Sequence, residues 1–415
     1  MEPMTRVRPV LAADPPLTRR ELGALAAGGL ASLALPPAVA RVAAPPALAY
    51  APGAAVPVAL AGVPRGARPD DVARAVRAAA LAADDLAWLH PGDTVLIKVA
   101  CNSGNAYPAT TDPVAIRAMV ELLRARGAGH VLVGDMSGVQ AVRFSKDRTR
   151  GSTRALMERN GIARAAREAG AEVRAFEEAG WDGFYDERPA VRGTWAGPVM
   201  LPAVLREVDH VVLMPRCARH VLAGSTLGLK AAVGWWRHDT RLEYHRDAAT
   251  FAEKTADANF VPTMLARQRL VLTCATQVLT AFGPDTGWVH APETGLVFAS
   301  RSIVAHDMVS LAWLLEGRRE MPAAKRDGLL DDPNGSGTFV NVANRVVVPW
   351  LGGVGDVVRA EWLPRWDLDT VWDDRVLRRA FAVTGGVPRL ELGVADGGVP
   401  APLRARLAAH VTLPV

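Results

Sequence analysis

Residues 93–135 read DTVLIKVACNSGNAYPATTDPVAIRAMVELLRARGAGHVLVGD, and this stretch decides the fold. The apolar run at its start predicts a buried strand, and HVLVGD at its end predicts another. Between them a helix is expected, with Asp112 as its N-cap, Pro113 at its first position, and Gly127 and Gly129 at its end. A strand, a helix and a strand in this order predict a βαβ unit with parallel strands.

The same alternation of apolar runs and Ala/Arg-rich helical stretches continues outward from this unit. Further strands are expected in VPVALAGV (56–63), AEVRAF (171–176), DHVVLMP (209–215), RLVLTCAT (269–276) and LVFAS (296–300). Helices are expected over 69–89, near 153–170, over 226–236, over 261–268 and over 303–315. The pattern predicts an α/β fold, a mainly parallel sheet with helices on both faces, over residues 56–315. Residues 316–415 are less regular and are expected to form a C-terminal extension without an assigned role.

The N-terminal stretch LTRRELGALAAGGLASLALPPAVA has the pattern of a twin-arginine export signal. Arg19 and Arg20 precede a weakly apolar run over residues 22–35, followed by two prolines and a small-x-small motif at 38–40. This run is shorter than the roughly 20 apolar residues of a membrane-spanning helix, so no stable membrane span is expected in the mature chain. We therefore expect a signal over residues 1–40, the twin-arginine translocase as a partner, and a periplasmic or other extracytoplasmic location.

A Pro/Ala-rich linker over residues 41–55 follows the expected signal. A second small-x-small motif at 47–49 leaves the mature start between about residues 41 and 50. Because the twin-arginine route carries folded proteins, it suits a chain that acquires a cofactor or partner before export. A chain folded before export also has no need of disulfides to hold it together.

Composition excludes several classes of function. The 48 basic and 43 acidic residues are interspersed, the formal charge is only +5, and no basic run alternates with aromatic residues, so nucleic acid is not expected as a partner. Cys101, Cys217 and Cys274 are far apart and form no CxxC motif. The chain alone therefore supports no disulfide framework, zinc knuckle or iron–sulfur cluster.

Charged residues stand where three of the predicted parallel strands end. Lys98 lies near the end of one strand, Asp135 ends the next, and Arg216 follows a third. Ligands bind beyond the carboxyl ends of such strands, and a buried charge needs a partner or a ligand. Lys98 and Asp135 either pair with each other across neighbouring strand ends or serve a ligand, and the two roles are compatible.

Polar residues between Lys98 and the following helix are further candidates. Asn102 comes directly after the first strand, and Thr111 and Asp112 stand at the helix start. Thr111 and Asp112 are first of all capping residues, which satisfy unpaired backbone N–H groups. A helix N-terminus at this edge of a sheet also favours an anion, so a carboxylate or phosphate contact is the second interpretation.

The stretch RHVLAGSTLGLKAAVGWWRHDTRLEYH, residues 219–245, places Lys230 between His220 and His245. The chain has only five lysines among its 48 basic residues, so a retained lysine points to a need for a compact or titratable amine. Thr226 belongs to a small-residue turn that lacks the full spacing of a nucleotide-binding P-loop. The final HDTRLEYH is expected to be a solvated polar loop, and a lone histidine is more often structural than catalytic.

Several of these blocks, in the same order, resemble the family called domain of unknown function 362. The blocks are VLIKVACNSGNAYPATTDPVAIRAMVELLRARGAGHVLVGD, VDHVVLMPRCARHVLAGSTLGLKAAVGWW, FGPDTG and LVFASRSIVAHDMVSLAWLL, and the resemblance covers about residues 56–315. The family pattern is matched by Lys98, Asn102, Thr111, Asp112, Pro113, Pro215, His220, Thr226, Lys230, Gly234 and Asp307. The chain departs from it at Arg216, Arg219, Ala231 and Cys274, and it lacks the ferredoxin-type cysteines of many relatives.

The spacing also resembles, more distantly, the nickel-pincer lactate racemases, in which a cofactor-bearing lysine lies between two histidines. His220, Lys230 and His245 would take those positions. The resemblance implies a comparable α/β domain. No HxH or HxxxH cluster supports a metal site independently, and the sequence assigns no particular metal or cofactor.

Three functions follow as hypotheses. The first is an exported enzyme, or a protein that holds a metal or cofactor, with a Lys/His/Asp pocket for a small anionic ligand at the carboxyl edge of the sheet. The second is a non-catalytic ligand-binding or assembly component of an exported redox complex, and the third is a racemase of the nickel-pincer kind. The expected catalytic residues are Lys98, His220, Lys230 and His245. The expected ligand-binding residues are Asn102, Thr111, Asp112, Asp135, Arg216, Thr226 and Asp307.

Overall fold

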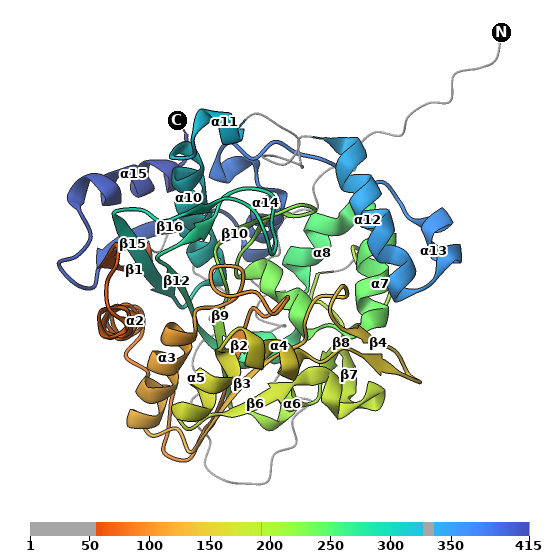
Figure 1. Ribbon diagram of the computed structural model, residues 1–415, viewed down its shortest axis with the longest axis horizontal. Helices are drawn as coiled ribbons and strands as arrows, with labels where there is room; N and C mark the ends of the chain where they lie inside the picture. The colour runs from red at the N-terminus through yellow and green to blue at the C-terminus, as the bar shows by residue number, and fades with distance from the viewer. Residues whose placement is uncertain (1–54, 192, 327–335, 415) are drawn as a thin grey trace.

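The computed structural model describes residues 55–191, 193–326 and 336–414 (Figure 1). The expected twin-arginine signal over 1–40, and the linker up to residue 54, lie outside the described residues. No helix among the residues that the structure describes is both long and apolar enough to cross a lipid bilayer.

An eight-stranded sheet forms the centre of the fold, in the order β16-β1-β15-β12-β9-β2-β3-β6. Its strands are β1 (Ala55–Pro64), β2 (Thr94–Val99), β3 (His130–Asp135), β6 (Glu172–Ala175), β9 (His210–Met214), β12 (Gln268–Ala275), β15 (Thr294–Ser300) and β16 (Arg389–Val394). Only β15 runs antiparallel to its neighbours, β1 and β12; every other pair is parallel. The predicted mainly parallel sheet is confirmed.

Helices cover both faces of this sheet, as predicted (Figure 1). One face carries α2 (Pro69–Ala83), α3 (Pro113–Ala125), α4 (Thr153–Arg159) and α5 (Ile162–Glu168). The other carries the 3₁₀ helix η3 (Leu229–Trp235), α8 (Phe251–Asp257), α10 (Ile303–Arg319) and α14 (Arg375–Thr384). Because side chains alternate along a strand, Val58 and Leu60 of β1 pack into the second layer while Ala59 and Ala61 pack into the first.

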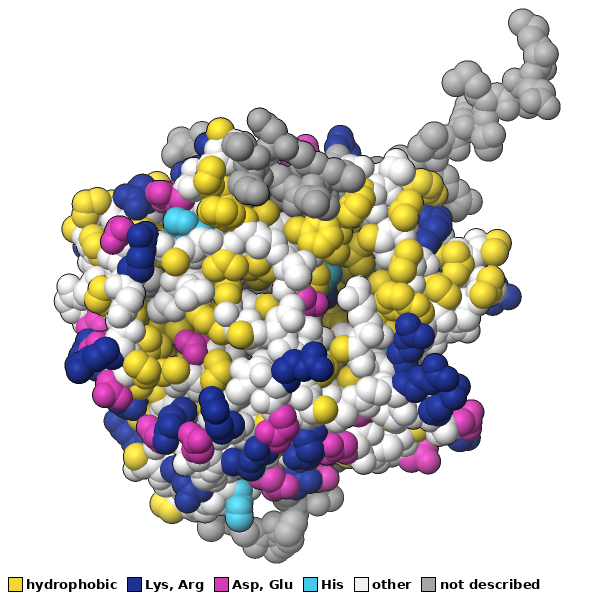
Figure 2. Space-filling view, in the orientation of Figure 1, with side chains coloured by type: hydrophobic (Ala, Val, Ile, Leu, Met, Phe, Trp, Pro, Cys, Tyr) yellow, Lys and Arg dark blue, Asp and Glu magenta, His cyan; other side chains and the backbone are white. Residues whose placement is uncertain are grey.

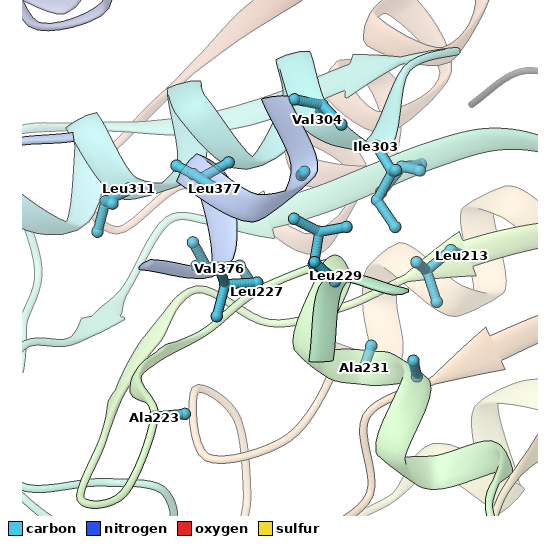
Figure 3. Packing of buried hydrophobic residues seen from close by; sticks show 14 of the residues in the cluster. Leu213, Ala223, Leu227, Leu229, Ala231, Ile303, Val304, Leu311, Val376 and Leu377 are labelled. Atoms are coloured by element: carbon cyan, nitrogen blue, oxygen red, sulfur yellow. The ribbon is translucent and has the colours of Figure 1, made fainter. Parts of the chain in front are cut away.

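Figure 3 shows the second layer from close by, where η3 meets α10 and α14. Leu227 and Leu229 lie against Ile303 of α10 and against Val376 and Leu377 of α14, and all of these side chains are buried. Segments far apart in the sequence therefore hold η3 in place above the strand ends.

Two expectations about local structure need correction. The helix expected near 153–170 is two helices, α4 and α5, because Gly161 between them has φ +86°, outside the helical range. The helix expected over 226–236 begins only at Leu229 and is the 3₁₀ helix η3. Residues 224–226 form the short strand β11 instead.

The expected solvated loop HDTRLEYH is wrong: these residues form the helix α7 (His238–Arg246). His238, Arg241, Tyr244 and His245 on this helix are buried. Backbone carbonyls of other segments accept hydrogen bonds from His238 and Arg241, and the side chains of Thr255 and Asn344 are the partners of Tyr244 and His245. These bonds make burial of the polar side chains possible. A sequence pattern of charged residues carries no sign of such distant carbonyls.

Residues 316–415 contribute to the main body of the fold. They form α11 (Ala323–Arg326), α12 (Gly337–Leu351), α13 (Val354–Arg359), α14, β16 and α15 (Ala401–Val411). Strand β16 extends the sheet by parallel pairing with β1, α12 packs on α7, and α15 packs on α10. The expected extension thus adds an edge strand and helices on the same layers.

The remaining described elements are short. A second sheet of order β11-β10-β13-β14 joins β10 (Ala218–His220), β11 (Gly224–Thr226), β13 (Val278–Leu279) and β14 (Val289–His290). The others are β4 (Arg143–Phe144), β5 (Thr149–Arg150), η1 (Phe176–Ala179), η2 (Trp181–Gly183), β7 (Phe184–Glu187), β8 (Val199–Pro202), α6 (Val204–Glu207), η4 (Ala248–Thr250), α9 (Pro262–Arg267) and η6 (Val371–Asp373).

Exposed apolar side chains gather on α12, on α13 and on the residues that follow α13 (Figure 2). They are Val342, Val346, Val354, Val358 and Trp362. In Figure 2 this region lies at the right, where yellow side chains are frequent. The inner side of α12 reaches the site described below.

The contact between the C-terminal residues and the sheet is testable at Gly62 of β1. A Cβ at this position would lie 2.1 Å from the carbonyl oxygen of Gly398, so the loop after β16 must shift. We expect Gly62→Ala to lower the free energy of unfolding by about 1–3 kcal/mol, measured by urea denaturation. The control is Gly393→Ala on β16, where a Cβ meets no atom within 4 Å. Equal stability of the two variants would contradict the described contact.

Candidate functional site

A buried ion pair joins the ends of β2 and β3. Lys98 Nζ lies 2.9 Å from Asp135 Oδ1, and both side chains are almost fully buried. The same ammonium donates to the carbonyl oxygens of Val99 and Ala231, each at 2.9 Å. The predicted pairing is confirmed. All three ammonium hydrogens are used, so Lys98 supplies charge and position, and no free N–H.

Asp135 also accepts two backbone hydrogen bonds, which fix the position of the ion pair. Its Oδ2 accepts a hydrogen bond from the Cys101 backbone N–H at 2.7 Å, and its Oδ1 accepts one from Met136 N–H at 2.9 Å. A Cβ on Gly234 of η3 would lie 2.1 Å from Asp135 Oδ1 and 2.5 Å from Lys98 Nζ. Only a glycine allows η3 to pack this closely on the pair.

Thr111 and Asp112 form hydrogen bonds that hold the fold together. Thr111 Oγ1 donates to the Met214 carbonyl at 2.7 Å and accepts from Ala100 N–H at 2.8 Å, which joins the ends of β9 and β2. Asp112 accepts from Val114 N–H at 2.9 Å and caps α3, as predicted. Neither residue is among those lining the cavity described next.

A cavity of about 160 Å³ lies at the carboxyl edge of the sheet. Seven of the eleven predicted site residues line it: Lys98, Asn102, Asp135, His220, Thr226, Lys230 and His245. Thr111, Asp112, Arg216 and Asp307 are not in the lining. The strand-end loops and the 219–245 stretch therefore converge on one concavity. Its size suits a small ligand of a few carbon atoms.

Lys230 lines the same cavity as Lys98 but has different partners. Its Nζ forms no hydrogen bond or ion pair with any residue that the structure describes, and its nearest ring faces are those of Tyr244 at 5.6 Å and Phe251 at 6.0 Å. Burial lowers the pKa of Lys230 from 10.5 to about 7, and repulsion by Arg216, Arg241 and Lys98 acts in the same direction. A large fraction of the amine is thus neutral at neutral pH.

His245 is a neutral base held by a residue of the C-terminal region. Its Nδ1–H donates to Asn344 Oδ1 at 2.7 Å, and the Asn344 amide nitrogen donates to the His245 carbonyl at 2.8 Å. This pair of bonds fixes the amide orientation and leaves the lone pair on His245 Nε2. Burial lowers the pKa of His245 to about 3, so the ring is neutral at neutral pH.

His220 has the opposite tautomer. Its Nδ1 accepts hydrogen bonds from the backbone N–H groups of Leu222 at 3.1 Å and Ala223 at 3.3 Å. The neutral ring therefore carries its hydrogen on Nε2. Burial and repulsion by Lys230 and Arg216 keep the pKa of His220 well below its usual value.

Arg216 is a buried cation with unused donors. Its side chain is 1% exposed, and its Nη1 lies 3.4 Å from Asp285 Oδ1. Its Nε and Nη2 are buried and form no hydrogen bond with the described residues. These two N–H groups lie on one side of the guanidinium and match the two oxygens of a carboxylate. A buried polar group without a partner costs about 1–3 kcal/mol, which a bound anion would recover.

Asp307 holds the turn that carries Lys230. Its two carboxylate oxygens accept from Gly228 N–H at 2.8 Å and Leu229 N–H at 2.7 Å. His306 Nδ1 donates to the same carboxylate at 2.9 Å. Asp307 thus fixes the start of η3, one residue before Lys230.

Arg241 and Asn344 belong to the site but were not predicted from the sequence. Arg241 lines the cavity and donates to the carbonyls of Trp236 at 3.0 Å, Ser137 at 2.6 Å and Met136 at 2.9 Å. Burial lowers its pKa to about 10, so it stays a cation at neutral pH. Asn344 lies 99 residues from its partner His245. No local pattern marks either residue.

Other features of the described residues bear on metal and thiol chemistry. No group of three or more His, Cys, Asp and Glu side chains is arranged to hold a metal ion within residues 55–191, 193–326 and 336–414. The three cysteines are buried and free. Burial raises the pKa of Cys101 to about 12, which keeps this thiol protonated and unreactive.

The titration of Lys230 predicts a pH dependence of stability. Since its pKa falls from 10.5 in the unfolded chain to about 7 on folding, the unfolded chain binds one more proton between these pH values. Relative to Lys230→Met, the free energy of unfolding of the wild type should rise from pH 7 to pH 9, by at most about 1.4 kcal/mol per pH unit. Below pH 7 the difference should be constant. Urea denaturation at each pH measures it.

The control for this experiment is Lys146→Met, which removes a lysine from an exposed loop. This variant should follow the wild type at every pH. A difference between wild type and Lys230→Met that does not change with pH would show that the folded chain keeps Lys230 protonated.

Comparisons with known proteins give a family and distant structural similarities. The family model described as domain of unknown function (DUF362) matches residues 95–312. The lactate racemase apoprotein from Thermoanaerobacterium thermosaccharolyticum is similar at 15% identity and a TM-score of 0.34, over 53% of this chain and 50% of that one. A protein from Thermotoga maritima is similar at 13% identity and a TM-score of 0.33, over 56% of each chain.

The chain thus spans about half the length of these solved structures. No curated protein matches it. The family match covers more than half of the sequence, from β2 to α10, and includes every strand-end loop of the cavity. The chain belongs to the domain of unknown function 362 family.

Proposed function

We propose that this protein is an exported enzyme that binds a small anionic substrate in the cavity and transfers protons to and from it through Lys230 and His245. The observation that carries the proposal is the Lys230 amine, which lies in a cavity without a described partner. Export rests on the sequence pattern around Arg19 and Arg20.

The charges around the cavity favour an anion. Lys98 and Arg241 line the cavity together with Asp135 and Asp285, and Arg216 lies close enough to repel Lys230. Three cations minus two carboxylates leave one positive charge before Lys230 is counted. In a site with little water, this excess attracts a carboxylate or phosphate group more strongly than in solution.

The proton-transfer groups have complementary states at neutral pH. His245 offers a lone pair on Nε2, and Lys230, with a pKa of about 7, exists as both ammonium and amine. An acid or base with a pKa near the working pH is the most effective in proton transfer. Asn344 and Asp307 position these two groups through His245 and through the start of η3.

Anion binding tests the proposal. Acetate, lactate, pyruvate and inorganic phosphate are added separately to the protein at pH 6, where Lys230 is mostly charged, and affinity is measured by calorimetry. At least one of these anions should bind, and Lys230→Met should weaken it about 10- to 100-fold because a charge-assisted hydrogen bond is lost. The control Lys146→Met should bind as the wild type does. If no anion binds, or if Lys230→Met binds equally well, the proposal fails.

A second candidate function uses Lys230 as the attachment point of a nickel-containing group. The observation in its favour is that His220, Lys230 and His245 line one cavity, with an unpaired amine and an imidazole lone pair. These groups fit such a centre, since imidazole nitrogen is a good ligand for nickel. Lys230 would carry the group and the histidines would flank it; when bound, it would allow a carbon–hydrogen bond of the substrate to break and re-form.

Intact mass and metal content distinguish the two candidates. Protein is purified from a host with working twin-arginine export, and its mass and nickel content are measured. The first candidate predicts an unmodified Lys230 and no stoichiometric nickel. An adduct on Lys230 together with one nickel per chain would replace the first candidate by the second.

A further inference from the structure

We infer that the substrate is a small oxo acid, and that Lys230 attacks its carbonyl carbon to form an imine. This inference rests on the proposed function and deepens it by naming the substrate class. It draws on the surroundings of Lys230 and the lone pair of His245 in the cavity, and on the unused donors of Arg216, which lies behind the lining residue Asp285.

The surroundings of Lys230 differ from those of the two buried lysines, Lys98 and Lys254. Lys98 is saturated by Asp135 and two carbonyls. Lys254 lies 3.7 Å from carboxylate oxygens of both Glu243 and Asp247 and also donates to their carbonyls. Lys230 alone among these three has no carboxylate and no carbonyl partner in the described residues. Its amine is therefore free to act on a ligand.

The charged groups that act on Lys230 are cations, and no carboxylate among the described residues pairs with it. Burial is the main cause of the lowered pKa of Lys230, and repulsion of its protonated form by Arg216, Arg241 and Lys98 adds to it. A lysine that is desolvated and close to other cations becomes a neutral amine, which is the nucleophilic form. The ring faces of Tyr244 and Phe251 make the surroundings more apolar.

Arg216 provides the recognition of a carboxylate. Its Nε and Nη2 are buried, adjacent and unbonded within the described residues, which is the arrangement that binds two carboxylate oxygens side by side. Arg216 does not itself line the cavity, but its partner Asp285, 3.4 Å from Arg216 Nη1, does. An acid whose carbonyl is close to its carboxylate can meet both groups, and a cavity of about 160 Å³ restricts it to a short chain.

The reaction balances without any cofactor. The Lys230 lone pair forms a bond to the carbonyl carbon, and the electron pair of the C=O bond moves to oxygen, which takes up a proton. The nitrogen passes a proton to His245 Nε2, which gives the carbinolamine. His245 then returns this proton to the hydroxyl group, water leaves, and the nitrogen lone pair forms the C=N bond of a protonated imine. Amine, carbonyl compound and one proton thus give iminium ion and water.

Reduction with borohydride tests the inference. The full-length protein is incubated with pyruvate, 2-oxobutanoate, glyoxylate or acetoacetate, treated with sodium borohydride, and analysed by intact mass and peptide mapping. At least one acid should leave a reduced adduct on the peptide that contains Lys230. The rate of trapping should increase as pH rises through about 7, where the amine loses its proton.

Three variants make the result specific. Lys230→Arg keeps the positive charge but has no nucleophilic amine, so it should bind the acid and give no adduct. Lys146→Arg, in an exposed loop, should be trapped as the wild type is. His245→Gln should still form the adduct on Lys230, but at least tenfold more slowly, because the group that relays the proton is absent.

The outcomes separate this inference from the function on which it rests. If the oxo acids bind to the wild type but borohydride leaves no adduct on Lys230, the inference is wrong and the anion site stands. An adduct of equal yield in Lys230→Arg would also overturn it, since another amine would be responsible. If no carboxylate binds at all, the proposed function fails together with the inference.

Discussion

The buried pair of Lys98 and Asp135 is the constraint on which the site depends. It joins the ends of two parallel strands, and Lys98 extends the contact to the backbone of η3 through the Ala231 carbonyl. Loss of either charge would leave the other buried without compensation, at a cost of about 3–5 kcal/mol. Because Gly234 packs directly on the pair, this interaction sets how closely η3 approaches the strand ends, while Asp307 holds the start of η3.

Lys98, Arg241 and Lys230 all line the cavity, but they differ in their hydrogen-bond partners, and this difference explains their different charge states. Lys98 and Arg241 are buried and satisfied, so they contribute a fixed positive potential. Lys230 has no carboxylate partner of its own, so burial, together with this potential, lowers its pKa. The same amine would be an ordinary ammonium if the aspartate at the strand end paired with it instead. The pairing of Lys98 with Asp135 thus leaves Lys230 without a carboxylate partner among the described residues.

Much of the fold and part of the site could be predicted from the sequence. The βαβ unit of residues 93–135 has periodic apolar positions, an Asp-Pro helix start and glycines at its end, and these local signals determine local structure. The convergence of strand ends follows from parallel pairing. The helix α7 and the roles of Arg241 and Asn344 did not follow, because their burial depends on carbonyls and an imidazole more than 90 residues away. Thr111 neither caps α3 nor lines the cavity, because its hydroxyl bonds Ala100 N–H and the Met214 carbonyl, and the second partner lies 103 residues away.

The hydrogen bond between Asn344 and His245 has a consequence for the order in which the cavity is completed during synthesis and folding. His245 is synthesised long before Asn344, and until α12 docks on α7 the imidazole has nothing to hold its tautomer. Until then, the tautomer and the orientation of the His245 ring would not be fixed. The last quarter of the polypeptide therefore completes the hydrogen bonding of the cavity, and a chain truncated before α12 would lack the bond that fixes the orientation of this ring.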